Sequence, residues 1–395
     1  MQGWVIAGLG LGLAWNAYAQ SWSVLKSGST NVLAGVHFPS PETGFVVGSQ
    51  GTILKTMNGG ATWVPLNSGT DASLGTVHFV DAQRGWVGGG HSSFPFFSGE
   101  ILRTGDGGAT WTKTTFAAFI FSIRFRNALE GYAVGGGSGE TYGLLSIFKT
   151  TDGGLTWIAQ HNANGKSWLS QVALTDSSGA RAVALGPYGM YFRTSDGGAQ
   201  WDSLPDLLSL EAQWSDVTFS APGTGYAAGT VWGPQTCGHP GCPEAVIVKT
   251  SDHGATWKRL TVAVKAGLSG IHFPDPNSGW AVGDSGTLLH TANAGASWTE
   301  EDRPTLERLT AVHFPDPRTG YVVGFGGVIL KFGAGAAVLP AAPRGKAGRM
   351  ASRAWFLPGG NGAADALGRI FSRSLEEGQG PPRLYPDGKR SGPAN

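Results

Sequence analysis

One strand pattern recurs seven times between Val36 and Gly324, and it constrains the fold of this 395-residue chain more than any other feature. Each copy opens with a short apolar strand, turns at glycine, continues with an aromatic-rich strand and ends near a Lys-Thr-like pair. The opening strands follow one another at steps of 41, 46, 49, 45, 54 and 41 residues. They are Val36-His37-Phe38, Val77-His78-Phe79, Ile123-Arg124-Phe125, Val172-Ala173-Leu174, Val217-Thr218-Phe219, Ile271-His272-Phe273 and Val312-His313-Phe314. A repeat of roughly 40–50 residues built only of short strands predicts an all-β fold, a β-propeller with one four-stranded blade per copy.

Six of the copies carry the same short hairpin motif, Thr-x-Asp/Asn-x-Gly-x-x-Trp, which is known as an Asp-box. The six acidic or amide positions are Asn58, Asp106, Asp152, Asp196, Asp252 and Asn293. We expect each of these side chains to bond backbone N–H groups two residues further on, while glycine supplies the positive φ of the turn. The tryptophan that follows is expected to pack between blades. The motif therefore predicts a structural role for these residues.

The seventh copy ends before any Asp-box tryptophan, so its blade lacks one strand. The segment Trp22–Thr30 parallels Trp63–Thr70, and Trp22 precedes Val36 by the same 14 residues that separate Trp63 from Val77. The N-terminal strand is therefore predicted to complete the seventh blade, which closes the ring and removes two open sheet edges.

Both ends of the chain differ from the repeat. Residues 1–19 combine an apolar run with Ala17-Tyr18-Ala19, which predicts a signal peptide and a secreted, periplasmic or cell-surface protein. Residues 20–335 are assigned to the propeller, and residues 336–395 to a basic tail rich in glycine, proline and alanine. The tail is either poorly ordered or a degenerate copy of a domain that it weakly resembles, the C-terminal sorting domain of Bacteroidetes-type secreted proteins. The formal net charge of +1 indicates no partner class.

Two groups of side chains invite a metal interpretation. In an exported chain Cys237 and Cys242 are expected to form a disulfide that closes a small loop, and adding His239 still leaves a zinc site one ligand short. The repeated histidines are expected to be packed and hydrogen-bonded, with a ring of metal ligands as the alternative. They are His37, His78, His272 and His313. We therefore expect neither a metal nor a cofactor.

Functional residues are best sought where the copies differ. The connections between the second and third strands are short in blades 1, 4, 6 and 7 but long in blade 2 (Gly88–Glu100), blade 3 (Gly135–Ser146) and blade 5 (Thr230–Glu244). Aromatic residues on loops of a rigid scaffold are typical of recognition surfaces. The candidate binding residues are His91, Phe94, Phe96, Phe97, Tyr142, Trp232 and His239. The alternative is that these side chains pack over the channel mouth and bury one another.

The Asp-boxes, together with the strands Gly131-Tyr-Ala-Val-Gly135 and Gly279-Trp-Ala-Val-Gly283, resemble the photosystem II stability and assembly factor family of BNR-repeat propellers. The resemblance extends from Trp22 to about Gly335. It implies a non-catalytic scaffold that binds a protein partner.

Two enzyme families share the Asp-box. Sialidases need an arginine cluster and a Tyr/Glu pair that the sequence lacks, and xyloglucan-active glycosidases use two propellers where this chain has one. The Asp-box acids belong to different blades, too far apart for a catalytic carboxylate pair. We therefore predict an exported, monomeric, non-catalytic scaffold for a protein partner, with no nucleic acid and no transmembrane span. The alternative is a carbohydrate-active propeller, either a lectin-like binder or a divergent glycosidase.

Overall fold

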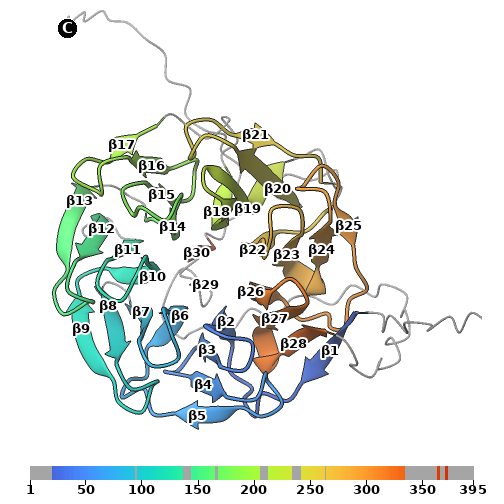
Figure 1. The fold of residues 1–395 in the computed structure, drawn as a ribbon, viewed down its shortest axis with the longest axis horizontal. Helices are drawn as coiled ribbons and strands as arrows, with labels where there is room; N and C mark the ends of the chain where they lie inside the picture. The colour runs from blue at the N-terminus through green and yellow to red at the C-terminus, as the bar shows by residue number, and fades with distance from the viewer. Residues whose placement is uncertain are drawn as a thin grey trace, which may run out of the picture.

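The computed structural model describes residues 20–93, 96–136, 144–164, 168–204, 212–233, 242–262 and 264–333, together with 363–364 and 370–371. Seven four-stranded antiparallel sheets stand around a central channel (Figure 1). The structure thus confirms the seven-bladed propeller that the repeat predicts.

The blades follow the chain order, with the first strand of each blade innermost. Blade 1 has β2 (Leu33–His37), β3 (Gly44–Gly48), β4 (Ile53–Thr56) and β5 (Val64–Leu66), and blade 2 has β6 (Ser73–Phe79), β7 (Gly85–Ser93), β8 (Phe96–Thr104) and β9 (Thr112–Phe116). Blade 3 has β10 (Phe119–Phe125), β11 (Gly131–Gly136), β12 (Leu144–Thr150) and β13 (Ile158–Asn164), and blade 4 has β14 (Gln171–Leu174), β15 (Ala182–Leu185), β16 (Tyr191–Thr194) and β17 (Asp202–Ser203). Blade 5 has β18 (Gln213–Ala221), β19 (Thr224–Gly233), β20 (Cys242–Thr250) and β21 (Lys258–Arg259), and blade 6 has β22 (Leu268–His272), β23 (Gly279–Gly283), β24 (Leu288–Thr291) and β25 (Thr299–Glu300). Blade 7 has β26 (Leu309–Asp316), β27 (Thr319–Gly324), β28 (Ile329–Gly333) and β1 (Ser21–Leu25).

The hydrophobic core lies between neighbouring blades. The phenylalanine that ends an opening strand stacks on an aromatic residue in the second strand of the preceding blade. Ring centroids lie 3.6 Å apart for Phe38 and Tyr321, 3.6 Å for Phe79 and Phe45, 3.5 Å for Phe125 and Trp86, and 3.7 Å for Phe273 and Tyr226. The second strand begins with glycine for the same reason, because a Cβ on Gly85 would lie 2.4 Å from the Phe79 ring. The repeated aromatic residues therefore hold neighbouring blades together.

The N-terminal strand closes the ring, as predicted. β1 pairs antiparallel with β28, and Trp22 stands opposite Phe332. The Trp22 ring lies 5.2 Å from that of Trp280 in blade 6, at an edge-to-face angle of 84°. Blade 7 is thus built from both ends of the described propeller, and its outer strand carries an aromatic residue into the junction with blade 6.

The Asp-box hairpins have a common set of hydrogen bonds that differs in one respect from the prediction. The side-chain oxygen accepts the backbone N–H of the residue four positions on, as in Thr62 N–H to Asn58 at 2.9 Å, and not two positions on. The threonine two residues earlier closes the hairpin, since Thr56 Oγ1 accepts the N–H of Gly60 at 2.9 Å and donates to Asn58 at 3.0 Å. The longer span arises because two consecutive residues adopt positive φ, 60° at Gly59 and 82° at Gly60.

The predicted packing of the Asp-box tryptophans between blades is also found. Trp63 meets Phe38 of its own blade edge to face at 6.0 Å and joins the core cluster that contains Tyr321 of blade 7.

Several predictions fall at the ends of the described chain. The signal peptide, residues 1–19, lies outside the described residues, as does most of the tail, in which Ala363–Ala364 (β29) pairs with Ile370–Phe371 (β30).

Cys242 is disulfide-bonded, and its predicted partner Cys237 lies outside the described part of the chain. Within the described residues there is no helix with the length and apolarity that a membrane crossing requires.

Candidate functional site

The two faces of the propeller carry different connections. The Asp-box hairpins lie on one face, called here the Asp-box face. Because successive strands are antiparallel, the connections from second to third strand and from one blade to the next lie on the opposite face, called here the hairpin face. Four of the connections on the hairpin face are tight turns, as predicted. They are at Ser49–Gly51, Pro187–Gly189, Asp284–Gly286 (η2) and Phe325–Gly327 (η3).

The long connections of blades 2 and 5 are largely strand rather than loop, which corrects the sequence interpretation. In blade 2 the ladder between β7 and β8 continues to Ser93 and Phe96. In blade 5 the ladder between β19 and β20 continues to Gly233 and Cys242. Pairing satisfies the backbone N–H and C=O groups that an irregular loop would expose. Both segments are therefore hairpins, and each one lengthens the sheet of its own blade beyond the ring. In blade 3, β12 extends along β13 to the pair Leu144 and Asn164.

The structure places four of the seven predicted binding residues and does not gather them into one cluster. His91 Nε2 lies 2.9 Å from the carboxylate of Asp71, in the connection from blade 1 to blade 2, and Phe97 pairs with Ser92 on the blade 2 hairpin. Trp232 lies on the blade 5 hairpin and is 46% exposed. Phe94, Tyr142 and His239 lie outside the described residues, and Phe96 is described in its backbone alone, as part of β8.

An exposed aromatic residue that the sequence interpretation missed stands on the same face as Trp232. Tyr188 occupies the tight turn of blade 4, next to blade 5, and is 66% exposed. Its φ is +57°, a conformation that bulky residues rarely adopt. A turn sequence of Pro187-Tyr188-Gly189, with tyrosine where glycine is the favoured residue, is the signal that would have revealed it. The middle residues of the other three tight turns have the same positive φ, 56° at Gln50, 54° at Ser285 and 65° at Gly326. The exposed aromatic ring, and not the backbone conformation, therefore distinguishes the turn of blade 4.

The central channel encloses a cavity of about 330 Å³, lined by the innermost strand of every blade. Four of its residues are the repeated histidines, which form an arc across blades 6, 7, 1 and 2. Ring centroids lie 4.8 Å apart for His272 and His313, 4.6 Å for His313 and His37, and 4.9 Å for His37 and His78.

Three of these histidines accept a hydrogen bond from the next blade through Nδ1. His37 Nδ1 accepts the backbone N–H of Phe79 at 3.3 Å, and His78 Nδ1 accepts that of Phe125 at 3.4 Å. His313 makes the equivalent bond to Phe38 across the ring closure at 3.3 Å. The packed, hydrogen-bonded interpretation is thus confirmed for these three. No group of three or more potential metal ligands is found among the described residues.

Burial favours the neutral form of the four histidines in the arc. It lowers the pKa of His78 to about 3 and that of His272 to about 4, and it holds the pKa values of His37 and His313 well below their usual range. A neutral ring is also required by the hydrogen bonds, because a protonated Nδ1 cannot accept a backbone N–H. The arc is therefore neutral at physiological pH.

The other half of the channel carries two charged residues. Arg124 takes the histidine position in blade 3, and Asp216 lies on the innermost strand of blade 5. The Asp216 carboxylate accepts the backbone N–H groups of Val217 at 2.9 Å and Ile271 at 3.0 Å. Burial raises the pKa of Asp216 to about 6, although Arg124 opposes the shift.

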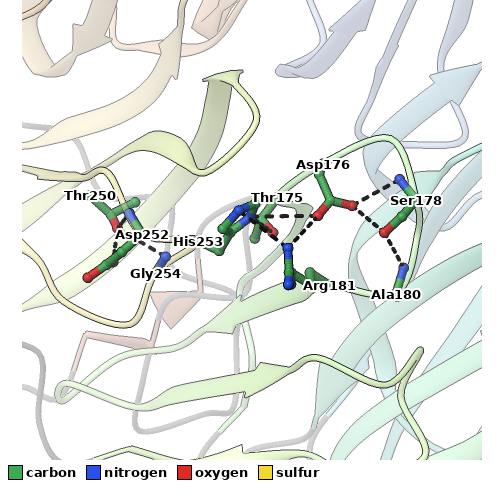
Figure 2. A network of polar contacts seen from close by, with 9 residues as sticks. All are labelled: Thr175, Asp176, Ser178, Ala180, Arg181, Thr250, Asp252, His253 and Gly254. Atoms are coloured by element: carbon green, nitrogen blue, oxygen red, sulfur yellow. Dashed lines mark hydrogen bonds and ion pairs between the residues drawn. The ribbon is translucent and has the colours of Figure 1, made fainter.

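The junction of blades 4 and 5 departs from the Asp-box pattern (Figure 2). His253 replaces the first glycine of the box, and its Nδ1 lies 3.0 Å from Thr175 Oγ1 and 3.7 Å from Asp176 Oδ2. Arg181 Nη1 lies 3.5 Å from both Asp176 and His253. Hydroxyl and carboxylate face the same ring nitrogen, whereas a catalytic triad needs them on opposite nitrogens. The network therefore links two blades and is not arranged as a nucleophile and base.

Comparisons with known proteins agree with this architecture. The sequence profile of the family described as photosynthesis system II assembly factor YCF48 matches residues 14–119 and 247–333. A structure of YCF48 bound to D1 peptide has a TM-score of 0.60 at 20% identity, covering 80% of this chain and 97% of that chain. YCF48 from Cyanidioschyzon merolae has a TM-score of 0.59 at 18% identity, covering 79% of this chain and 98% of that chain.

Enzymes appear among the structural matches as well. A GH74 xyloglucanase from Xanthomonas campestris has a TM-score of 0.57 at 12% identity and covers 78% of this chain, but only 53% of the enzyme is matched. No curated protein sequence matches the chain. The likeness to the xyloglucanase shows a shared fold, while the profile match and the strand-by-strand repeat agree on the family predicted from the Asp-boxes. The chain is therefore a photosystem II assembly factor-like BNR β-propeller.

Proposed function

We propose that this chain is a non-catalytic assembly scaffold that binds a protein partner on its hairpin face, centred on Trp232 of blade 5 and Tyr188 of blade 4. The observation that carries the proposal is their exposure, 46% for Trp232 and 66% for Tyr188, on adjacent blades of one face. Large aromatic side chains supply most of the binding energy in protein interfaces. The YCF48 structure with D1 peptide supports peptide recognition by a propeller of this type.

Both aromatics stand on backbone that is fixed before a partner arrives. Trp232 belongs to the β19–β20 ladder, opposite Pro243, and an ion pair of 3.0 Å between Glu244 and Arg259 ties the base of that hairpin to β21. Tyr188 sits in a turn in which the Met190 N–H donates to Pro187 O at 3.2 Å. A preorganised surface loses little conformational entropy on binding.

The carboxylates do not support glycoside hydrolysis. The Thr110 hydroxyl donates to Asp106 and lowers the pKa of that carboxyl to about 2, and Thr156 does the same at Asp152. A general acid needs a raised pKa, and a glycosidase needs a second carboxylate across the bond. Asp216 has a raised pKa, but it is the single carboxylate among the described residues that line the channel.

The test compares the two faces with matched variants. Tyr188→Ser with Trp232→Ser removes the aromatics of the hairpin face. Met57→Ser with Leu155→Ser removes apolar side chains that are 70% and 62% exposed on the Asp-box face. We expect the hairpin-face variant to fold normally and to bind a partner captured from the native cell envelope at least about 30-fold more weakly, which corresponds to about 2 kcal/mol.

The Asp-box-face variant should bind as the wild type does. Loss of binding in that variant alone would contradict the proposal. Binding of xyloglucan or other glycans that both variants retain, with no protein partner captured, would favour the carbohydrate-active alternative.

Export and the monomeric state belong to the proposal too. The support for export is the Ala17-Tyr18-Ala19 cleavage pattern, and N-terminal sequencing of the mature protein should begin at Gln20.

A further inference from the structure

Arg124 places a partly buried positive charge in the central channel. Arg124 Nη1 donates to Ile123 O at 2.9 Å, and among the described residues the guanidinium forms no ion pair. Asp216 acts on it only at longer range, and the Asp216 carboxylate is already bonded to two backbone N–H groups. A guanidinium has five N–H donors, so Arg124 retains donors for a ligand that enters the channel.

The histidine arc presents further donors to the same cavity. The Nδ1 atoms of His37, His78 and His313 accept backbone N–H groups, so the proton of each neutral ring lies on Nε2. These histidines line the channel, and Nε2 lies across the ring from the Nδ1 atom that is bonded to the next blade, so we expect the Nε2–H groups to reach the cavity. Around the channel, Arg124 of blade 3 follows directly after His78, the last histidine of the arc, so the cavity offers N–H groups and a cation on neighbouring blades, the set of groups that binds anions in proteins.

We propose that the central channel binds a small ligand through a single carboxylate or phosphate group, held by Arg124 and the Nε2–H groups of the histidine arc. The cavity of about 330 Å³ exceeds the volume of an inorganic ion, so it has room for the uncharged body of an organic acid. Asp216 lies on the same channel wall and repels a second anionic group, which favours ligands with one such group. This site is separate from the hairpin-face surface and does not depend on the proposed partner.

The first experiment is titration calorimetry on the full chain at neutral pH and constant ionic strength. Acetate, butyrate, inorganic phosphate and a phosphate monoester are the probes, with chloride as the reference anion, so that carboxylates and phosphates are compared. We expect at least one probe to bind the wild type at least tenfold more tightly than Arg124→Gln. The matched control is Arg181→Gln, an arginine outside the channel that pairs with Asp176, and this variant should bind as the wild type does. Equal binding by wild type and Arg124→Gln, or no binding by the wild type, would overturn the proposal.

A second measurement does not depend on any variant folding. Crystals of the full chain soaked in bromide should show an anomalous peak in the channel within contact distance of Arg124. A peak elsewhere, with none in the channel, would overturn the proposal. Nitrogen chemical shifts of the imidazoles should also show protonation at Nε2 alone, and protonation at Nδ1 would contradict the donor arrangement.

Discussion

The two faces of this propeller differ in how closely its blades agree. On the Asp-box face, six hairpins repeat one set of hydrogen bonds from Asn58 to Asn293. On the hairpin face, blades 1, 4, 6 and 7 have tight turns whereas blades 2 and 5 have extended hairpins, and the turn of blade 4 alone among the four carries a large exposed aromatic side chain, Tyr188. The repeated Asp-box positions therefore stabilise the ring, while the positions that differ on the hairpin face are free to bind a partner.

The largest expected effect concerns the repeated histidines and pH. Their folded pKa values lie below the unfolded value of 6.5, so the unfolded chain binds more protons and stability falls as pH falls below about 6.5. Asp216 acts in the opposite direction, because its folded pKa of about 6 exceeds its unfolded value of 3.8.

For four histidines and one aspartate, linkage gives a net loss of at most about 6 kcal/mol in the free energy of unfolding between pH 7 and pH 5. Urea denaturation at pH 7, 6 and 5 measures this loss. A flat profile would show that the arc is not buried and neutral in the folded protein.

The next effect concerns closure of the ring. Trp22→Ala removes a large aromatic side chain from the junction of blades 6 and 7 and should lower the free energy of unfolding by about 3–5 kcal/mol. Val24→Ala is the control, since Val24 lies on the same strand and is 41% exposed, and it should cost less than about 1 kcal/mol. Equal losses would mean that β1 contributes only backbone pairing.

An Asp-box change should have a smaller effect and leave binding intact. Asn58→Ala removes the bond from Thr62 N–H and should cost about 1 kcal/mol of stability. Partner affinity, measured on the folded variant, should be unchanged. An affinity loss without a stability loss would place function on the Asp-box face.

The smallest effect is a gain in stability. Tyr188→Gly relieves the positive φ and should raise the free energy of unfolding by about 0.5–1 kcal/mol while weakening partner binding. Such a trade between stability and function is common at binding sites. A destabilised Tyr188→Gly variant would show that the Tyr188 side chain packs on the propeller and stabilises it in the absence of a partner.

The sequence predicted the features that recur and failed at those that occur once. The 14 residues from Trp22 to Val36 predict ring closure, because Trp63 precedes Val77 by the same number of residues, and β1 does pair with β28. The sequence predicts loops where the extended hairpins lie, because their glycine-rich strands lack the apolar alternation of a half-buried strand. Backbone pairing, to which every residue type contributes, decides their structure.

Side-chain partners were harder to foresee. The hydrogen bond from the Phe79 N–H to His37 Nδ1 joins residues of different blades. Only the assembled propeller shows which imidazole nitrogen accepts this bond. His253 departs from the Asp-box pattern in the sequence, but its contact with Thr175 crosses from blade 5 to blade 4, which the repeat does not show. Tyr188 was overlooked because a single exposed residue leaves no periodic signal.

Hydroxyl-radical footprinting of the complex with the captured partner distinguishes recognition on the hairpin face from recognition on the Asp-box face. We expect oxidation of Trp232 and Tyr188 to slow when the partner binds, whereas oxidation of Met57 and Leu155 on the Asp-box face should not change. Protection of Met57 and Leu155, with Trp232 and Tyr188 as reactive as in the free protein, would contradict the assignment of recognition to the hairpin face.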